Sequence, residues 1–354
     1  MKSNLKFFKK VRSLPVDQFF QNVLYDKKIG YYNSKQPLGL KGDFITSPKL
    51  SNLFSEMIAI WIISTWEIFG KPKKINLVEL GPGDGSLTKT LLDVFKRFPI
   101  FNNSKKIYLF EISSFLKKIQ KKNIKNNSVQ WINDFKKIKN GPVIFFGNEF
   151  FDAIPIKQFK RDQGKLYEKY FFLGKNSQIV EKFKKASTED VKILNSYRSL
   201  KDLKFIEFPK LGLNELKKII KIINKLNGCL LIIDYGYLKP HNQSTLQSVI
   251  RHKRNILLNN LGKADVTSHV NFSILNEFFL KNKLKVKKVI TQKKFLEKMG
   301  IMKRAEIIAS KMKFNDQTNL YLRLKRLLNP NLMGELFKVI LTYKFRRNKY
   351  FGFD

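Results

Sequence analysis

The sequence predicts an α/β fold with a mostly parallel sheet, and three observations support this prediction. Strand-like and helical segments alternate between residues 75 and 152, which is typical of βαβ units. The length of 354 residues suits one large α/β domain with additions, or two domains. Four hydrophobic segments run directly into tight polar turns, at residues 75–80, 107–110, 143–146 and 230–233. Because ligands bind beyond the carboxyl ends of parallel strands, these four turns predict one composite site.

The first 70 residues predict a helical N-terminal region. An amphipathic helix is expected at residues 16–25 and a long apolar helix at 53–69. Between them, residues 42–48 are rich in Gly and Pro, which predicts a loop with a functional role. Residues 71–155 then form the expected cofactor-binding half of the core.

The second half of the chain contains an insertion and then returns to the core. Strand patterns around Gly164 and Gly174 predict an inserted antiparallel hairpin region at residues 156–204. Residues 205–354 are expected to complete the sheet, with a substrate loop near 241–272. The expected elements are helices at 213–226, 274–281 and 305–328 and strands at 228–233, 284–290 and 335–342.

The net charge of +41 suggests nucleic acid as a partner, but the distribution of the charge argues against it. Lys greatly outnumbers Arg, although Arg is the better group for bidentate phosphate recognition. The lysines are spread along the whole chain, together with abundant Asn, Ile and Phe. A solvated lysine coat is therefore favoured, and a nucleic-acid groove is kept as an alternative.

Membrane and secretory classes do not fit the sequence. The longest apolar run, at residues 57–66, is far shorter than the roughly 20 residues needed to span a bilayer. Residues 1–14 alternate Lys with Phe and do not resemble a secretory signal. The single cysteine, Cys229, lies in a hydrophobic run and predicts a small buried residue. A bacterial cytoplasm is the expected location.

A Gly-rich turn follows the first predicted core strand. Gly81, Gly83 and Gly85 precede a predicted helix, and glycine there lets the backbone turn sharply beside a ligand. The next strand ends at Glu111, whose carboxylate can accept both hydroxyl groups of a ribose. The Gly-x-Gly-x-Gly spacing and the polar, aromatic turn at residues 148–152 favour S-adenosylmethionine over a nicotinamide cofactor.

Asp134 follows a short predicted strand at residues 129–131. In that position its carboxylate could meet an adenine edge. Capping of the following Lys-rich turn is an equally good interpretation.

The scarce acidic residues gather in the predicted turns. The chain has only 28 of them, yet eight lie in or beside turns rich in Gly, Pro or Asn: Asp43, Asp84, Glu111, Asp134, Glu149, Asp152, Asp234 and Asp265. An acidic pocket in a basic protein suits a cationic cofactor and a cationic methyl acceptor. Each acid taken singly could also be a cap or a turn former.

Metal binding is not expected, because the three histidines show no ligand spacing and the lone cysteine adds none. A basic stretch at residues 251–254 lies within the predicted substrate loop. A solvated loop is the favoured interpretation of this stretch, and contact with substrate remains open.

Taken together, these segments resemble the MidA family of class I S-adenosylmethionine-dependent methyltransferases, over nearly the whole chain. The segments that carry the resemblance are 42–48 with Phe54 and Glu56, 79–83, 111–113 with Gln120, 148–155, 234–236, 265–270, 292–301 and 333–338. Some positions depart from the family pattern. Asp84 stands where the family often has Arg, and Lys49 stands where Glu is common.

The resemblance implies a fold, a reaction and a substrate. The expected fold is a Rossmann-like, mostly parallel seven-stranded sheet with an added substrate-covering region. Glu79 and Thr46 join the residues expected to bind the cofactor. The expected reaction is methylation of an arginine on a complex I subunit during assembly. Glu149 and Asp152, beside Asn148, are expected to clamp the guanidinium, with Asp43 and Asp265 in reserve.

Other functions stay open at this point. The charge keeps an RNA methyltransferase as one alternative, and a non-catalytic assembly chaperone with the same fold is another. The sequence leaves a homodimer possible.

Overall fold

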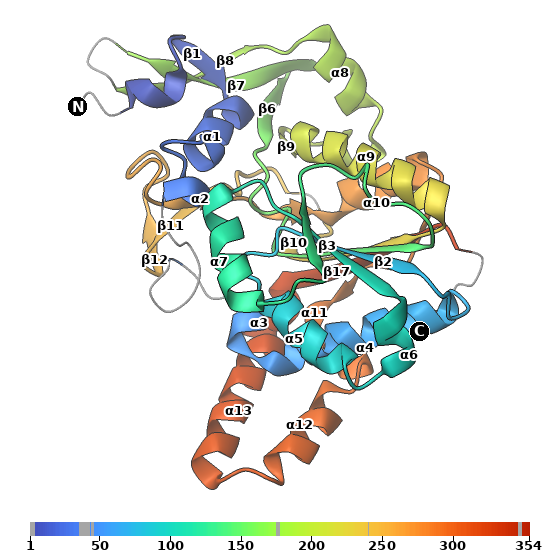
Figure 1. Ribbon diagram of the computed structural model, residues 1–354. Coiled ribbons are helices and arrows are strands. Elements are labelled where there is room, and N and C mark those ends of the chain that lie inside the picture. Colours follow the sequence, from blue (N-terminus) through green and yellow to red (C-terminus); the bar gives the residue numbers. More distant parts are fainter. Residues whose placement is uncertain (1–3, 35–42, 44–45, 175–177, 240, 346–348) are drawn as a thin grey trace. The chain divides into compact units, whose positions relative to one another are not determined.

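The computed structural model describes residues 4–34, 43, 46–174, 178–239, 241–345 and 349–354 (Figure 1). Contacts divide the chain into two compact units whose segments alternate along the sequence. Unit 1 comprises Met1–Phe44, Phe151–Lys217 and Tyr237–Phe278, and unit 2 comprises Ile45–Phe150, Lys218–Gly236 and Phe279–Asp354. Within the described ranges, no helix is both long and apolar enough to cross a bilayer.

A mixed sheet forms the centre of unit 2. Its strands are β2 (Ile75–Leu80), β3 (Lys105–Phe110), β4 (Val129–Ile132), β5 (Val143–Asn148), β10 (Cys229–Tyr237), β15 (Lys285–Val286) and β17 (Phe337–Tyr343). The strand order is β15-β17-β10-β5-β2-β3-β4. The pairs from β10 through β4 are parallel, and β17 is antiparallel to β10. This path of seven strands confirms the predicted mostly parallel sheet, and two further short strands, β14 (Val270–Asn271) and β16 (Ile290–Thr291), pair with β10 and β17 off the path.

Several helices of unit 2 contribute to its core. They are α3 (Ser47–Leu50), α4 (Asn52–Ile68), α5 (Ser86–Phe95), α6 (Pro99–Ser104), α7 (Ser114–Ile124), α11 (Gln292–Lys298), α12 (Ile301–Ala309) and α13 (Phe314–Leu328), with a π-helical turn at Pro330–Gly334. Leu77, Ile144 and Cys229 form one fully buried row across three strands, in the same core cluster as Trp61 of α4. The central strands are buried on both faces, as is typical of a parallel sheet, and Cys229 is the small buried residue that was expected.

Three predicted elements of unit 2 differ from the structure. The predicted turn at residues 234–236 was wrong, because β10 continues to Tyr237 and β17 pairs with it as far as Tyr235. The predicted strand at 284–290 is two short strands, β15 and β16 (Ile290–Thr291), which both pair with β17. The predicted helix at 305–328 is two helices, since α12 ends at Ala309 and α13 begins at Phe314.

Unit 1 contains a five-stranded antiparallel sheet. Its strands are β1 (Ser13–Pro15), β6 (Lys157–Asp162), β7 (Lys165–Leu173), β8 (Ile179–Lys185) and β9 (Phe205–Phe208). The turn between β6 and β7 places Gln163 and Gly164 at positive φ, as a tight hairpin requires. The inserted hairpin region is thus confirmed, although Lys175 and Asn176 of its second predicted turn lie outside the described residues.

The remaining elements of unit 1 are a smaller sheet and several short helices. The three-stranded sheet has the order β12-β11-β13, with β11 at Gln247–Ile250, β12 at Lys253–Asn255 and β13 at Asp265–Thr267. The other elements are Leu5–Phe8 (3-10), α1 (Val16–Tyr25), α2 (Tyr31–Ser34), α8 (Thr188–Asn195), Arg198–Leu200 (3-10) and β14 (Val270–Asn271). Two helices, α9 (Lys210–Leu226) and α10 (Phe272–Lys281), continue from one unit into the other along the chain.

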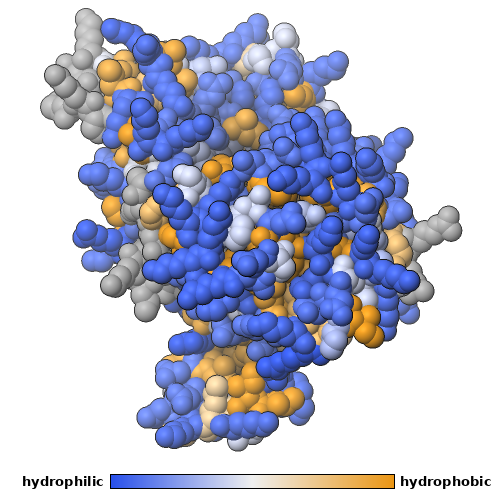
Figure 2. All heavy atoms as spheres, in the orientation of Figure 1, coloured by the Kyte–Doolittle hydropathy of each residue, from blue (hydrophilic) through white to orange (hydrophobic). Residues whose placement is uncertain are grey.

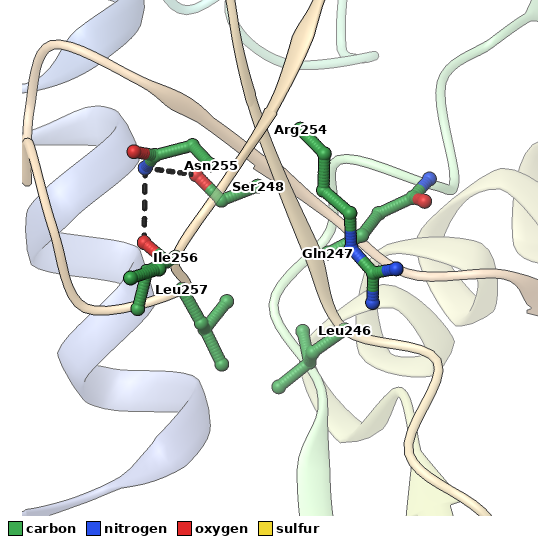
Figure 3. A pocket seen from close by; sticks show the side chains of 7 residues that line it. All are labelled: Leu246, Gln247, Ser248, Arg254, Asn255, Ile256 and Leu257. Carbon is green, nitrogen blue, oxygen red and sulfur yellow. Dashed lines mark hydrogen bonds between the residues drawn. The ribbon is translucent and has the colours of Figure 1, made fainter.

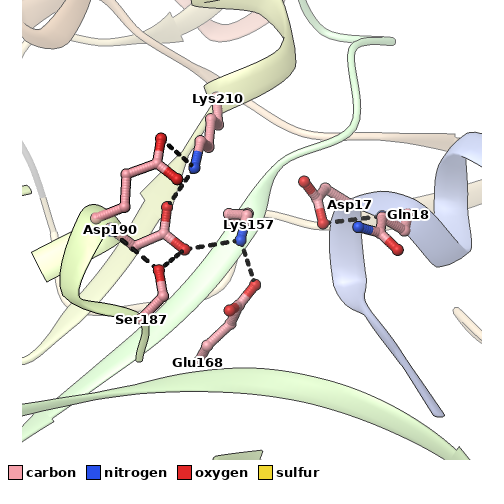
Figure 4. Close-up of polar contacts among 8 residues, drawn as sticks. Asp17, Gln18, Lys157, Glu168, Ser187, Asp190 and Lys210 are labelled. Carbon is pink, nitrogen blue, oxygen red and sulfur yellow. Dashed lines mark hydrogen bonds and ion pairs between the residues drawn. The ribbon is translucent and has the colours of Figure 1, made fainter. Parts of the chain in front are cut away.

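A buried ionic cluster connects the large sheet of unit 1 to α8 (Figure 4). The Lys157 ammonium lies 2.7 Å from Glu168 and 2.9 Å from Asp190, and Lys210 lies 2.8 Å from the other oxygen of Asp190. Burial disfavours the charged form of Lys157, but its two carboxylate partners outweigh this effect and raise the pKa of the ammonium. The cluster therefore stays ionised inside the fold.

The surface is largely hydrophilic. Figure 2 shows hydrophilic side chains spread over the visible face rather than gathered in one stripe, with an apolar area over α12 and α13. Phe314 and Leu322 of α13 are 79% and 59% exposed. The spread of polar side chains fits the predicted lysine coat.

Candidate functional site

The Gly-rich turn of unit 2 needs glycine for steric reasons. Gly81, Gly83 and Gly85 all have positive φ, between 56° and 85°, where other residues are strained. A Cβ on Gly81 would lie 2.5 Å from Cδ2 of Phe150, and one on Gly85 would lie 3.0 Å from Cδ1 of Ile124. The turn is therefore packed tightly between the end of β2 and its neighbours, and α5 begins directly after it.

Glu111 lies at the carboxyl end of β3, as predicted, and only 6% of it is exposed. Its Oε1 accepts a hydrogen bond from the Ser113 amide at 2.7 Å, and its Oε2 accepts one from Gln120 at 3.0 Å. Burial raises the pKa of Glu111, although these hydrogen bonds oppose the shift. A carboxylate has about four lone-pair sites, so this group can still accept further hydrogen bonds.

Gln120 connects the parts of this half of the site. Its amide nitrogen also donates to the Gly83 carbonyl at 2.8 Å, and its Oε1 accepts a hydrogen bond from the Trp131 indole at 2.8 Å. One side chain thus holds the Gly-rich turn, the acid after β3 and strand β4 together. Gln120 was named only among the residues that carry the family resemblance, and its role as a connector depends on contacts between distant segments.

Glu79 and Asp134, two further residues expected to bind the cofactor, have hydrogen-bond partners within the chain. Glu79 is 3% exposed and accepts a hydrogen bond from the Thr88 hydroxyl of α5. Burial raises the pKa of Glu79 to about 8, and the hydrogen bond from Thr88 opposes part of this shift. Asp134 is exposed, and its Oδ1 accepts the Lys136 amide at 2.8 Å. Its geometry is that of a turn cap, the alternative to contact with adenine.

The two departures from the family pattern lie together. The Lys49 ammonium of α3 is 2.8 Å from Oδ2 of Asp84 in the Gly-rich turn. Where the family commonly has Glu and Arg, this chain has Lys and Asp, so the signs of both charges are exchanged. Thr46 precedes α3 directly, without a side-chain cap bond. In the predicted 42–48 loop, Asp43 lies in a bend and Ser47 and Pro48 begin α3, whereas residues 42, 44 and 45 lie outside the described residues.

The end of β5 carries a strained glutamate. Glu149 has a φ of 51°, which is uncommon for a residue other than Gly or Asn. Its Oε1 accepts hydrogen bonds from the Ser47 amide at 3.1 Å and from the Asn148 side-chain amide at 3.0 Å. Among the described residues, none donates a hydrogen bond to the buried Oδ1 of Asn148. Strain and an unsatisfied acceptor at one strand end are typical of a functional site.

Asp234 has a supporting role in the same unit. Its Oδ2 accepts the Phe150 amide at 3.1 Å and its Oδ1 accepts the Tyr235 amide at 2.9 Å. Because both oxygens bind backbone amides and the residue is 0% exposed, Asp234 holds the turn after β5 in place.

Unit 1 brings together three of the predicted acids. Asp43, Asp152 and Asp265 are all at most 5% exposed. The Tyr31 hydroxyl donates to Asp43 at 2.6 Å, and the Tyr32 hydroxyl donates to Asp265 at 3.2 Å. Burial, together with the negative charges of Asp152 and Asp43, raises the pKa of Asp265 to about 8. A cationic group placed beside these acids would relieve their repulsion and keep them ionised.

The class of protein follows from unit 2. A parallel sheet of this order, with a Gly-rich turn after one strand and a buried carboxylate after the next, defines a class I methyltransferase fold. The chain belongs to the family described as "Putative S-adenosyl-L-methionine-dependent methyltransferase", which matches residues 57–290. It is therefore an S-adenosyl-L-methionine-dependent methyltransferase.

Individual relatives agree with this assignment. The chain is 30% identical to protein arginine methyltransferase NDUFAF7 of Xenopus laevis, over 92% of this chain and 80% of the relative. It is 29% identical to the human protein of that name, over 92% and 78%. A Burkholderia thailandensis crystal structure, bound to S-adenosyl-homocysteine, has the same fold, with a TM-score of 0.81 at 21% identity over 99% of this chain and 91% of that one.

The residues of unit 2 fit this cofactor. Glu111 has lone pairs left for ribose hydroxyls, and the glycines of the turn leave the backbone bare beside them. When bound, S-adenosyl-L-methionine supplies a methyl group activated by a positively charged sulfonium. Gln120 orients the Glu111 carboxylate, and burial of this carboxylate strengthens its interactions because water is excluded.

Proposed function

We propose that this protein is a protein-arginine N-methyltransferase that acts on a complex I subunit during assembly. The observation that carries the proposal is the acid cluster of unit 1, Asp43, Asp152 and Asp265, in a chain with 69 basic and 28 acidic residues. The names of the relatives, protein arginine methyltransferases identical at 25–30%, support the same substrate class. A cytoplasmic location is part of the proposal.

The chemistry of the acceptor explains why acids are needed. A guanidinium stays charged in proteins and offers five N–H donors in a planar fork, which carboxylates bind in pairs. Fixing the guanidinium in this way directs one of its terminal nitrogens toward the methyl group. Positioning of this kind lowers the activation barrier of methyl transfer mainly through entropy. We assign the binding of the guanidinium to Glu149 and Asp152, three residues apart in the chain, with Asp43 and Asp265 as supporting acids.

The first test is methylation in cells. Mass spectrometry of complex I subunits from cells with and without the gene should show an arginine methylation that disappears with the gene. An unchanged pattern would reject the proposed substrate. A Glu149→Ala variant that loses methylation but still supports assembly would show that assembly depends on the protein and not on its catalysis.

The second test separates the roles of the acids. Glu149→Gln and Asp152→Asn should each lower kcat/KM for an arginine substrate by about tenfold to a hundredfold, since each loses a charge-assisted hydrogen bond. Binding of S-adenosyl-L-methionine, measured by calorimetry, should change little. Asp162→Asn, on an exposed turn of unit 1, is the matched control. Equal activity of the variants and the control would contradict the assignment.

A further inference from the structure

A pocket of about 400 Å³ opens on the three-stranded sheet of unit 1, and its lining includes none of the acids Asp43, Asp152 and Asp265 (Figure 3). Strands β11 and β12 contribute Gln247, Ser248, Arg254 and Asn255 to its lining. Leu246, Ile256 and Leu257 complete it with apolar surface. The lining is therefore polar on the strands and apolar where the strands end.

The hydrogen bonds of Ser248 and Asn255 are made within the protein. The Ser248 hydroxyl donates to the Asp265 carbonyl at 2.9 Å and accepts from the Asn255 side-chain amide at 2.9 Å. That amide also donates to the Ile256 carbonyl at 2.9 Å (Figure 3). The polar groups of Ser248 and Asn255 are therefore occupied by partners within the protein. Recognition of a ligand depends on the other polar residues of the lining, Gln247 and Arg254.

Arg254 is the group that can recognise a ligand. Figure 3 shows its exposed side chain beside Gln247 and Leu246, on the other side of the strands from Ser248 and Asn255, as the pairing of Arg254 with Val249 and of Ser248 with Asn255 requires. Across the described parts of the chain, its guanidinium has no hydrogen bond or ion pair, and no acidic residue lines the pocket. A fork of N–H donors without an acceptor, above apolar walls, matches a planar carboxylate on a short aliphatic stem.

We propose that this pocket binds an acidic side chain of the protein substrate, near the arginine that is methylated. The inference rests on the proposed function, because it takes the substrate to be a protein whose arginine binds the acid cluster. RNA fits less well, since none of the seven lining residues is aromatic and a base would have no stacking platform.

The register of the sheet sets the spacing between the two substrate residues. Val249 of β11 lies directly opposite Arg254 on one side and Asp265 on the other, so all three side chains project from the same face. Two strand spacings separate Arg254 from Asp265 by about 10 Å. An extended peptide covers that distance in about three residues. The preferred substrate should carry Glu or Asp about three residues from its target arginine.

A double-mutant cycle between enzyme and peptide tests the proposal. The ligands are labelled Gly-Ser peptides with one central arginine and one glutamate moved along the chain, and binding is followed by fluorescence anisotropy. For wild type, changing the glutamate to glutamine at the preferred position should weaken binding about tenfold. For Arg254→Gln the two peptides should bind equally. Lys253→Gln, the next residue on β12, should behave as wild type.

The outcomes separate the pocket from the proposed function. Failure of every peptide to bind, or equal effects of the glutamate change on wild type and Arg254→Gln, overturns the pocket. If the coupling persists while no peptide arginine is methylated, the pocket stands and the proposed function fails. A peptide with lysine in place of the glutamate should bind wild type weakly. If Arg254→Glu binds this peptide more tightly, residue 254 contacts the peptide side chain directly. If Arg254→Gln weakens the binding of a labelled RNA but changes the binding of no peptide, the pocket binds nucleic acid and the proposal is overturned.

Discussion

At the scale of single residues, we propose that Glu111 contributes most to cofactor binding. It is buried, oriented by Gln120 and placed at a strand end. We expect Glu111→Ala to weaken binding of S-adenosyl-L-methionine about a hundredfold in calorimetry, because hydrogen bonds of two hydroxyls to a charged acceptor are lost. Asp134→Ala should bind the cofactor nearly as wild type does, since that carboxylate caps a turn. An equal loss in both variants would restore the adenine role of Asp134.

Glu79 should make stability depend on pH. The folded protein holds its proton up to about pH 8, whereas an unfolded glutamate releases it near pH 4.5. The folded state therefore binds more protons than the unfolded state within this window, and the free energy of unfolding falls as pH rises from 4.5 to 8. Glu79→Gln removes this dependence and still accepts the hydrogen bond from Thr88.

Urea denaturation across that pH window measures the effect. The stability of Glu79→Gln relative to wild type should increase steadily as pH rises to about 8 and then level off. Glu67→Gln, at an exposed glutamate of α4, is the control and should show no such trend. A constant difference between Glu79→Gln and wild type would show that Glu79 is ionised in the folded protein.

At the scale of secondary-structure elements, the Lys49–Asp84 pair connects α3 to the Gly-rich turn. The Asp84 side chain is 9% exposed and the Lys49 side chain 23%, so solvent screens the pair only in part. Lys49→Glu and Asp84→Arg should each lower the free energy of unfolding by about 1–2 kcal/mol, because each places like charges together. The double variant has the charge order common in the family and should recover most of the loss. Additive losses in chemical denaturation would show that the two charges do not interact.

The ionic cluster that connects β6, β7 and α8 should be a major source of stability in unit 1. Lys157→Met would leave Glu168 and Asp190 buried without their shared cation, which we expect to cost about 3 kcal/mol or more. Lys160→Met removes a 56% exposed lysine from the same strand and should change stability little. Thermal denaturation of the two variants compares them directly. Similar melting temperatures for Lys157→Met and Lys160→Met would mean that Glu168 and Asp190 do not need the Lys157 ammonium for stability.

At the scale of the whole molecule, the charge of +41 predicts weak contacts with any polyanion. RNA should therefore bind without sequence preference, and the affinity should fall steeply as salt is raised, because counterions are released on binding. Methyl transfer from labelled cofactor to RNA should be absent at physiological salt. Incorporation of methyl groups into RNA under those conditions would favour the RNA methyltransferase alternative over arginine methylation.

The sequence could predict where the proposed cofactor residues lie, at the ends of β2 and β3, because its signals there are local. Gly81, Gly83 and Gly85 follow an apolar strand directly, and Glu111 ends the next one, so a short stretch of chain contains both the pattern and its position. The hairpins of unit 1 were predictable for the same reason. The prediction of a turn at 234–236 was wrong, because the extension of β10 depends on its pairing with β17, about a hundred residues later in the chain.

The sequence alone therefore determined where β2 and β3 end and which residues follow them, Gly81 and Glu111. The tertiary structure decided what each acid contacts. Asp84 pairs with Lys49, Asp265 with Tyr32, and Asp234 holds the backbone of residues 150 and 235. Helix and strand periodicity are set by neighbouring residues, whereas these partners depend on packing between distant segments. A pattern along the chain therefore locates a carboxylate, and only the fold gives it a partner and a pKa.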